Sequence, residues 1–290
     1  MIAFKGCIIS HSDNLSEFMT SQSKDFMYEN APVVEVIAEV HWQLKPLLDS
    51  NLEYDPFFED FADVFSEEVT KEGFDYRELL VANEVPKELL AHKAIFRFRK
   101  DKDQWPLYQI GPGIFTVNIT PPYNGWQEFF RTISQGIDFL YQYYPFAQKY
   151  LVPYTLRLIY INAFGKNHGY TSLRDFITNK VNFTISLPEE LNAHVEEESL
   201  DFVTDFNFRL KDLKDSFATI KIGTGTFNGE PAVLIENRIF KHLHGTKVDK
   251  DNIKAWFNEA RDINRGLFEK YINQTTRDTF GSKLPYNESE

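Results

Sequence analysis

The sequence predicts an α+β protein whose two halves repeat the same order of elements. In some stretches apolar residues alternate with polar ones or run continuously, as in strands, and in longer segments they recur at three- and four-residue steps, as in helices. Aromatic residues make up 16% of the 290-residue chain, enough for a large core. The element order therefore predicts two pseudo-repeated halves, each an antiparallel sheet followed by a long helix.

Changes of composition along the chain set the expected boundaries. The first residues are polar and weakly patterned, the segment from Asn51 to Leu90 is strongly acidic, and the last residues are again polar. We expect a surface arm at 1–30, a first half at 31–150 with an acidic helical insertion at 51–90, a second half at 151–275 and a polar tail at 276–290.

The first half opens with a strand and ends with a core-facing helix. Pro32 precedes VVEVIAEVHW, a largely apolar run interrupted by Glu35 and Glu39, which predicts a well-buried strand. AIFRFRK, WPLYQI and GIFTVNI predict three further strands, because DKDQ and GPG between them have the composition of turns. From Trp126, apolar residues recur at helical spacing until Pro145, which predicts a long helix.

The segment IGPGIFTVN, which begins at Ile110, raises the question of a phosphate-binding loop. Such a loop places its glycines between a strand and the N-terminus of a helix, where backbone N–H groups converge on the anion. Here a second strand follows the glycines, and Pro112 lacks one of the N–H donors. We therefore expect a hairpin turn.

The segment DPFFEDFADVFSEEV predicts an acidic amphipathic helix, with phenylalanines and valine on one face and carboxylates on the other. Asp55 suits the N-cap and Pro56 suits the first turn. A solvated helix packed on the sheet explains the pattern. The alternative is an interaction surface for a basic protein partner, or a mimic of nucleic-acid charge. On that hypothesis the partner-binding residues are Glu59, Asp60, Asp63, Glu67 and Glu68.

The second half repeats the order of the first. YTLRLIYINAF, from Tyr154, predicts a strand equivalent to VVEVIAEVHW, and TSLRDFITN predicts a short inserted helix. Four strands follow in NFTISL, LDFVTDFNFRL, FATIKIGTGTF and AVLIENRIF, with Asn228 and Gly229 as a tight hairpin turn between the last two. The C-terminal segment then predicts a long helix capped by Asp249 or Asp251.

Charge and cysteine content narrow the function classes. With 43 acidic and 31 basic residues, the formal net charge is −12, which repels nucleic-acid phosphates and disfavours direct binding to DNA or RNA. The single cysteine, Cys7, cannot form an intramolecular disulfide, and no motif marks it as a nucleophile. No apolar run reaches the length of a membrane helix, and no secretory signal opens the sequence. We expect a cytoplasmic protein that does not bind membranes.

Local motifs complete neither a catalytic nor a metal site. His242 and His244 are two residues apart, so a strand would direct both side chains to one face, but no nearby Cys, Asp or Glu at ligand spacing completes a metal site. We expect no metal and no cofactor. His168 lies in a predicted loop without a nucleophile motif. Folding could also bring together a catalytic cluster that no local motif shows. The best candidates for its members are Asp205, Arg209, Glu236, His242 and His244.

Three stretches stand out as a set: PVVEVIAEVHW, IGPGIFTVN with YNGWQEF after it, and RLIYIN. Together they resemble a sporadically distributed family of prokaryotic proteins of about this length that has no established activity. The resemblance covers Pro32 to the end of the C-terminal helix, while the acidic segment 51–90 has no match in the family pattern. Sporadic distribution implies an accessory gene that moves between genomes, as in toxin–antitoxin or antiviral defence systems.

These observations favour a non-enzymatic protein-interaction component of a toxin–antitoxin or antiviral defence system, with a protein partner. A chaperone-like binder of unfolded chains is the first alternative, because a repeated antiparallel sheet with long helices can expose apolar grooves. An enzyme, either a nuclease or a hydrolase, is the second. Whether the chain forms a homo-oligomer is left open by the sequence.

Overall fold

The structure, a computed structural model, describes residues 26–285 apart from 49–50, 83, 87–88, 123–124, 184–187, 189, 191–193, 197–199 and 244–247. The strands of the main sheet are β2 (Val33–Trp42), β5 (Tyr76–Leu79), β6 (Phe96–Arg99), β7 (Leu107–Gly111), β8 (Ile114–Ile119), β9 (Pro153–Phe164), β10 (Val203–Arg209), β11 (Ser216–Phe227) and β12 (Glu230–His242). Two small sheets pair β1 (Phe26–Tyr28) with β13 (Lys283–Pro285) and β3 (Lys45–Pro46) with β4 (Glu53–Tyr54). The helices are α1 (Phe58–Lys71), α2 (Trp126–Tyr143), α3 (Ala147–Tyr150), α4 (Leu173–Asn179), α6 (Lys250–Tyr271) and α7 (Gln274–Asp278), with the 3-10 helix η3 (Lys166–His168).

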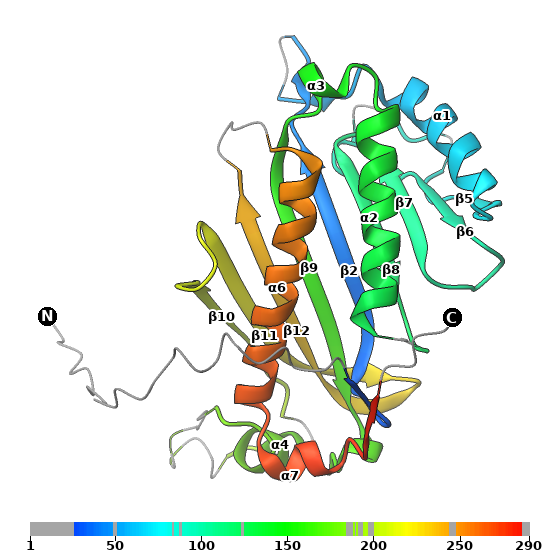
Figure 1. Ribbon diagram of the computed structural model, residues 1–290. Coiled ribbons are helices and arrows are strands. Elements are labelled where there is room, and N and C mark those ends of the chain that lie inside the picture. Colours follow the sequence, from blue (N-terminus) through cyan, green and yellow to red (C-terminus); the bar gives the residue numbers. More distant parts are fainter. Residues whose placement is uncertain are drawn as a thin grey trace, which may run out of the picture.

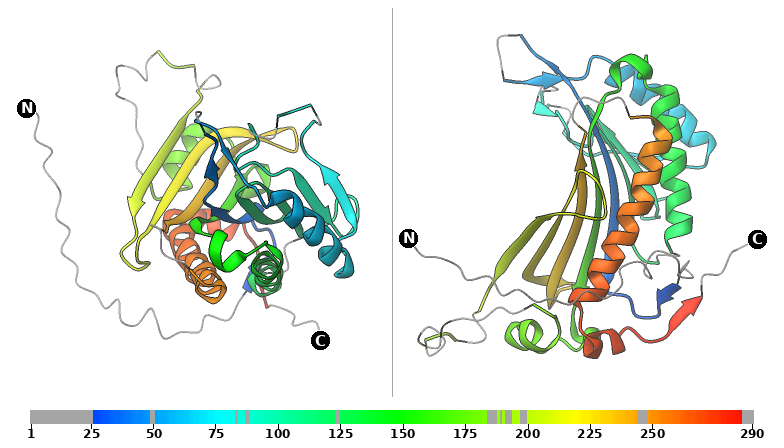
Figure 2. Two further views of the ribbon diagram at one scale, coloured as in Figure 1. Left: turned by 90° about the horizontal axis from the view of Figure 1, so that it is seen from above. Right: turned by 60° about the vertical axis from the view of Figure 1, so that its left-hand side comes forward.

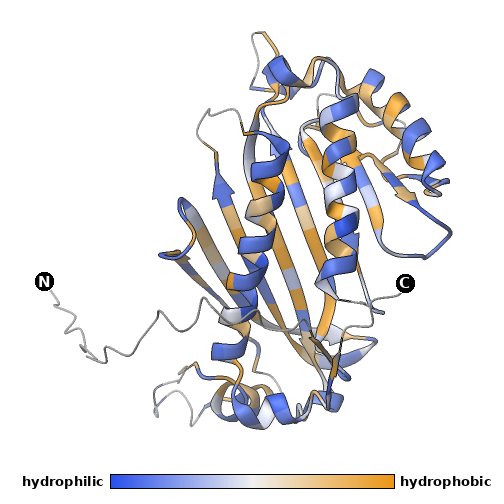
Figure 3. Ribbon diagram, viewed as in Figure 1, coloured by the Kyte–Doolittle hydropathy of each residue, from blue (hydrophilic) through white to orange (hydrophobic). Residues whose placement is uncertain are grey.

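A nine-stranded antiparallel sheet, in the order β10-β11-β12-β9-β2-β8-β7-β6-β5, forms the centre of the molecule. The long helices α2 and α6 lie side by side on one face of this sheet, and α1 packs beside α2 (Figure 1, Figure 2). Hydrophobic and hydrophilic residues alternate along all three helices, as expected for helices with one buried face (Figure 3). The predicted α+β class is confirmed.

The two halves of the chain contribute to the sheet in the same way. In each half the first strand pairs with the last one, β2 with β8 and β9 with β12, and a long helix follows. β2 and β9 also pair with each other, so the strands of both halves form one continuous sheet. The main core is shared as well, because Phe115 of the first half and Ile239 and Phe257 of the second belong to one cluster of buried residues.

Side-chain hydrogen bonds join the two long helices across the halves. The hydroxyl of Tyr141 on α2 donates to the carbonyl of Val248 at 2.6 Å, and Lys254 on α6 donates to Asp138 at 2.8 Å. Asp249 caps α6, as expected, by accepting a hydrogen bond from the N–H of Asn252 at 2.8 Å. Among the described helices, none combines the length and the apolar composition needed to cross a membrane.

The acidic amphipathic helix is confirmed as α1, but its start differs from the prediction. α1 begins at Phe58 with Phe57 at the N-cap, and no side chain caps it. The Asp55 carboxylate instead accepts hydrogen bonds from the N–H of Phe57 at 3.0 Å, from Nε1 of Trp42 at 3.0 Å and from the hydroxyl of Tyr144 at 2.8 Å. Asp55 therefore connects the start of α1 to the core. It does so because the buried Trp42 and Tyr144 side chains each need an acceptor for their hydrogen-bond donor.

The hairpin expected at GPG is confirmed. Gly111 on β7 pairs with Ile114 on β8, and Pro112 and Gly113 form the turn between them. Gly113 has a φ of +77°, the conformation that glycine supplies in a Pro-Gly turn. Gly111 is needed for a different reason, because a Cβ there would lie 1.8 Å from the carbonyl oxygen of Lys93.

The ends of the described chain differ from the arm and tail that composition suggests. Residues 26–28 of the expected arm form β1, and the ring of Tyr28 lies 5.1 Å from that of Phe280. The expected polar tail at 276–290 includes Phe280, which is fully buried, and its β13 pairs with β1. Aromatic contacts, which average composition does not reveal, hold these segments to the fold. Cys7 and most of the strand expected at NFTISL lie outside the described residues.

Candidate functional site

The face of the main sheet opposite α2 and α6 carries polar side chains at its centre, and we call it the open face. Four residues of β2 face the helices: Val36, Ala38, Val40 and Trp42. Glu35, Glu39 and His41 alternate with them and therefore point to the opposite side. No described helix covers this side of the sheet (Figure 2). The strand is well buried, as the sequence predicts, and the interrupting acidic residues lie on its second face.

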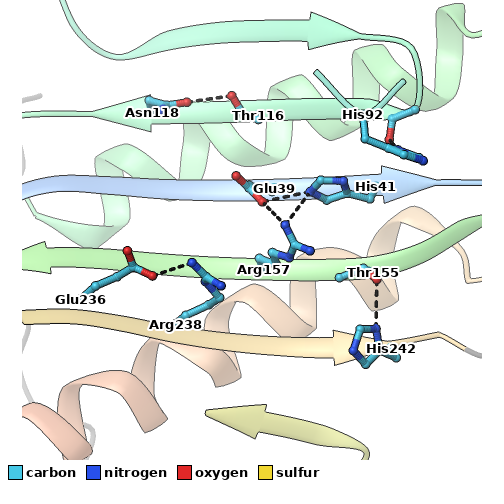
Figure 4. A network of polar contacts seen from close by, with 11 residues as sticks. Glu39, His41, His92, Thr116, Asn118, Thr155, Arg157, Glu236, Arg238 and His242 are labelled. Atoms are coloured by element: carbon cyan, nitrogen blue, oxygen red, sulfur yellow. Dashed lines mark hydrogen bonds and ion pairs between the residues drawn. The ribbon is translucent and has the colours of Figure 1, made fainter. Parts of the chain in front are cut away.

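Glu39 and His41 of β2 meet Arg157 of β9 at the centre of the open face (Figure 4). Oε2 of Glu39 lies 2.9 Å from Nε2 of His41 and 3.3 Å from Nη1 of Arg157. The exposed fractions of the side chains are 15% for Glu39, 5% for His41 and 36% for Arg157. The carboxylate is thus largely removed from water and held between two nitrogen donors.

These contacts decide the protonation state of Glu39. Burial alone would raise the pKa of its carboxyl group. The hydrogen bonds and charge interactions of His41 and Arg157 outweigh burial, so the pKa of Glu39 lies below its ordinary value of 4.5. Glu39 is therefore a carboxylate at neutral pH, and the energy of its contacts contributes to folding.

We expect Glu39→Gln to lower the free energy of unfolding by about 1 to 3 kcal/mol at pH 7, because the charge-assisted hydrogen bonds are lost. A carboxyl whose pKa is lowered by folding stabilises the protein above its unfolded pKa and loses this contribution as the pH falls through the folded value. The difference between wild type and variant should therefore shrink below about pH 4.5. Urea unfolding of the wild type and the variant at pH 7 and pH 3.5 measures this difference. A difference that does not change with pH would contradict the lowered pKa of Glu39.

The other polar side chains of the open face also pair with one another (Figure 4). The pairs are Thr155 with His242 at 3.1 Å, Glu236 with Arg238 at 2.6 Å, Thr116 with Asn118 at 2.7 Å, and Asn118 with Glu35 at 2.9 Å. They come from four neighbouring strands, β8, β2, β9 and β12. Carboxylates, imidazoles and guanidinium groups therefore bind to one another across the face.

Some buried nitrogens of the described part of the open face lack a hydrogen-bond partner, among them Nε of Arg238. Nδ1 of His41 makes no hydrogen bond with a described residue. The ring of His41 lies 6.0 Å from that of His92, whose Nδ1 is 3.2 Å from the Gly113 carbonyl and whose Nε2 is 3.5 Å from Glu53. A glutamate and a histidine in contact could act in general acid–base chemistry, provided that a substrate can reach them.

Two cavities of the described structure lie away from this pair. The larger, about 520 Å³, lies between α6 and the ends of β11 and β12, and among its lining residues are Lys241, His242 and Trp256 but not Glu39 or His41. A smaller one, about 150 Å³, is lined by residues such as Phe57 and Tyr150. Because substrate sites are concave, the centre of the open face has the character of a contact surface.

The catalytic candidates from the second half lie partly on the same face. In the strand register Asp205 of β10 is opposite Lys221 of β11, which is opposite Glu236 of β12, so the three share the open face. Glu236 is bound to Arg238, and no described residue hydrogen-bonds to the Asp205 carboxylate. These residues form a row across three strands, and they do not converge on one point.

The remaining candidates have separate partners. Arg209, at the end of β10, donates to Asp215 at 3.1 Å, and His242 lies against Thr155. His244 lies outside the described residues, so the proposed His242 and His244 pair has no geometry here. Within the described parts of the chain, no group of three His, Cys, Asp or Glu residues is placed to hold a metal ion.

His168 lies in the short 3-10 helix η3, where the sequence predicts a loop, and it is buried. Its Nε2 lies 3.2 Å from the carbonyl oxygen of Asn30, and its ring packs against Phe164 and Phe280. Burial lowers the pKa of His168 below its ordinary value of 6.5, although the contact with the Asn30 carbonyl acts in the opposite direction. These contacts indicate a structural role beside a second cluster of buried residues, to which Phe164 and Phe280 belong.

The carboxylates of α1 are displayed on the surface, as the amphipathic pattern predicts. Glu59, Asp60, Asp63 and Glu67 are exposed. Glu68 is half-buried and accepts hydrogen bonds from Lys71 at 2.6 Å and from the hydroxyl of Tyr143 at 3.1 Å. The acidic face of α1, which we define as Glu59, Asp60, Asp63, Glu67 and Glu68, is thus fixed at its C-terminal end to α2.

Sequence reasoning missed the trio at the centre of the sheet. The available signal was the two-residue spacing of Glu39 and His41 within an otherwise apolar strand, which places both on one face. Arg157 could not be assigned to them, because its position depends on the register between β2 and β9.

The comparisons with known proteins give no relative on which a family assignment could rest. No protein-family model, no curated protein and no solved structure matches this chain.

Proposed function

We propose that this chain is a non-enzymatic protein-interaction component that meets a basic surface of its partner through the acidic face of α1. The observation that carries the proposal is the contrast between the two sides of this helix. One side displays exposed carboxylates, while Phe61 and Phe65 on the other are fully buried. A negative surface of this kind attracts and orients a positively charged partner.

The anchoring of α1 supports a role in recognition. The Phe65 ring lies 5.5 Å from that of Phe98, 6.0 Å from that of Tyr108 and 6.1 Å from that of Phe115, so α1 is tied to three strands. Its carboxylates are therefore presented on a rigid helix, and binding does not have to order them first. Such preorganisation reduces the entropy cost of association.

Two further observations favour a specific interaction over the alternatives. Glu39 with His41, and Glu236 with Arg238, are paired with each other on the open face and line neither of the two cavities described above, whereas a nuclease or hydrolase needs such groups directed at substrate. Among the described residues, the large apolar side chains with the highest exposed fractions are Leu48, Phe146 and Val203, at 89%, 72% and 61%, and none of them lines either of the two cavities described above. A chaperone-like binder would gather such residues in one groove.

The proposal also concerns the kind of system in which this protein acts. The resemblance to a sporadically distributed prokaryotic family supports a place in a toxin–antitoxin or antiviral defence system. We also propose that the two halves are pseudo-repeats. Their common order supports this, since in each half a first strand pairs with the last strand and precedes a long helix.

The test is affinity purification of the tagged chain from its host, with the wild type compared with Asp60→Asn/Asp63→Asn/Glu67→Gln. We expect one stoichiometric basic protein with the wild type, and about tenfold weaker binding of that purified protein by the variant. The matched control neutralises three exposed carboxylates elsewhere, as Glu259→Gln/Asp262→Asn/Asp278→Asn, and should bind as the wild type does. Equal affinity of both variants and the wild type would refute the role of α1.

A further inference from the structure

We propose that the edge strand β10 pairs with β10 of a second copy of this chain, in an antiparallel register centred on Asn207, so that two main sheets join into one. This inference goes beyond the proposed function, because it concerns another surface and another partner. It begins from the position of β10, which ends the order of the main sheet and pairs only with β11 among the described residues.

The hydrogen-bond pattern shows which backbone groups of β10 point outward. Beyond its two ends, Leu210 N–H donates to Ser216, and the Phe202 carbonyl accepts from Thr224. In an antiparallel pair, bonding to the neighbour alternates along the strand. The even-numbered residues of β10 therefore bond to β11, and the odd-numbered residues direct their N–H and C=O groups away from the sheet. Unpaired groups of this kind are a template for another strand.

The side chains of these odd-numbered residues select the register. Asp205, Asn207 and Arg209 all lie on the open face. A two-fold axis at Asn207 places Asp205 of each copy directly opposite Arg209 of the other, which gives two pairs of opposite charge. Centring the pair on Asp205 or on Arg209 would instead oppose like charges, which is unfavourable between strands. A centre at Phe206 leaves Asp205 opposite Asn207 and forms no ion pair.

The side chains on the other face of β10 also fit this register. Phe206 and Phe208 point toward the helix side, and the pairing centred on Asn207 sets Phe206 of one copy opposite Phe208 of the other. Phe206 already stacks on Phe183 with ring centroids 4.9 Å apart, whereas Phe208 is 37% exposed. Pairing would cover this ring, and aromatic pairs across strands are favourable.

A hydrogen bond within the sheet holds the side chain of Asn207. Its side-chain oxygen accepts a hydrogen bond from Thr219 of β11 at 2.7 Å, which keeps the amide on the open face. Arg209 bonds to Asp215 at 3.1 Å, but both side chains are well exposed, with fractions of 68% and 47%. An exposed ion pair of this kind is weak, so Arg209 can turn to a carboxylate of the second copy.

Charge exchange gives the first test, read out by sedimentation equilibrium over a range of protein concentrations. We expect the wild type to form a dimer, Asp205→Arg and Arg209→Asp each to weaken it by about tenfold, and the double variant Asp205→Arg/Arg209→Asp to restore it. Circular dichroism confirms that each variant is folded. A wild type that stays monomeric at all concentrations overturns the proposal, and so does a dimer that is indifferent to the single substitutions.

Cross-linking tests the register separately. In a Cys7→Ser background, Asn207→Cys places two thiols opposite each other across the two-fold, at a Cα separation of about 5.5 Å, which a disulfide can bridge. Mild oxidation should give a covalent dimer. The matched control is Lys221→Cys, exposed on the same face one strand inward, which should remain monomeric. Equal cross-linking of both variants would show that contact is random and would overturn the register.

Discussion

Replacing Gly111 by alanine is expected to lower the free energy of unfolding by about 3 kcal/mol or more. A Cβ at this position would lie 1.8 Å from the carbonyl oxygen of Lys93 and 2.7 Å from its carbonyl carbon. Both are backbone atoms, so no rotamer change relieves the overlap. The strand β7 would have to move away from the segment before β6, where the N–H of Ile95 donates to Ile110 at 2.8 Å. Urea unfolding followed by tryptophan fluorescence measures the loss.

Gly165→Ala is the matched control for this substitution. Gly165 also lies outside the helices, but its φ is −103° and nothing lies within 4 Å of its Cβ position. The variant should stay within about 0.5 kcal/mol of the wild type. If Gly111→Ala proved equally harmless, the close approach of the two backbones would be wrong.

Phe65→Ala is expected to cost about 3 to 5 kcal/mol, the range for truncating a fully buried phenylalanine. Phe65 is 0% exposed and contacts aromatic rings of β6, β7 and β8, so the cavity would open where α1 meets the sheet. Val64→Ala, one residue earlier on the same helix and 39% exposed, should change stability by about 0.5 kcal/mol or less. Chemical denaturation of both variants tests this, and similar losses would place Phe65 outside the core.

Phe65→Ala also bears on the proposed function. Loosening α1 leaves its carboxylates in the chain but removes the rigid support that presents them. Binding of the basic partner should therefore weaken even at temperatures where the rest of the protein is folded. Partner affinity and unfolding of the same variant separate the two effects, since Val64→Ala should alter neither.

Several elements could be predicted from the sequence because their determinants are local. The helical spacing of phenylalanines and carboxylates identified α1, and the Pro-Gly turn identified the hairpin of β7 and β8. Residue type alone narrowed the N-cap of α6 to Asp249 or Asp251, and the structure has Asp249 there. Asp55 was not an N-cap, because two aromatic donors brought from Trp42 and Tyr144 compete for its carboxylate.

The sequence by itself determined the α+β class, the amphipathic helices, the acidic face of α1 and the absence of a local metal or nucleotide motif, since each follows from residue types within a few positions. Only the tertiary structure decided that both halves share one sheet and one core, that Glu39, His41 and Arg157 meet, and that β10 ends the sheet. These features join segments more than a hundred residues apart, such as Glu39 and Arg157. Strand order and register place them, and both are set by the packing of the whole chain.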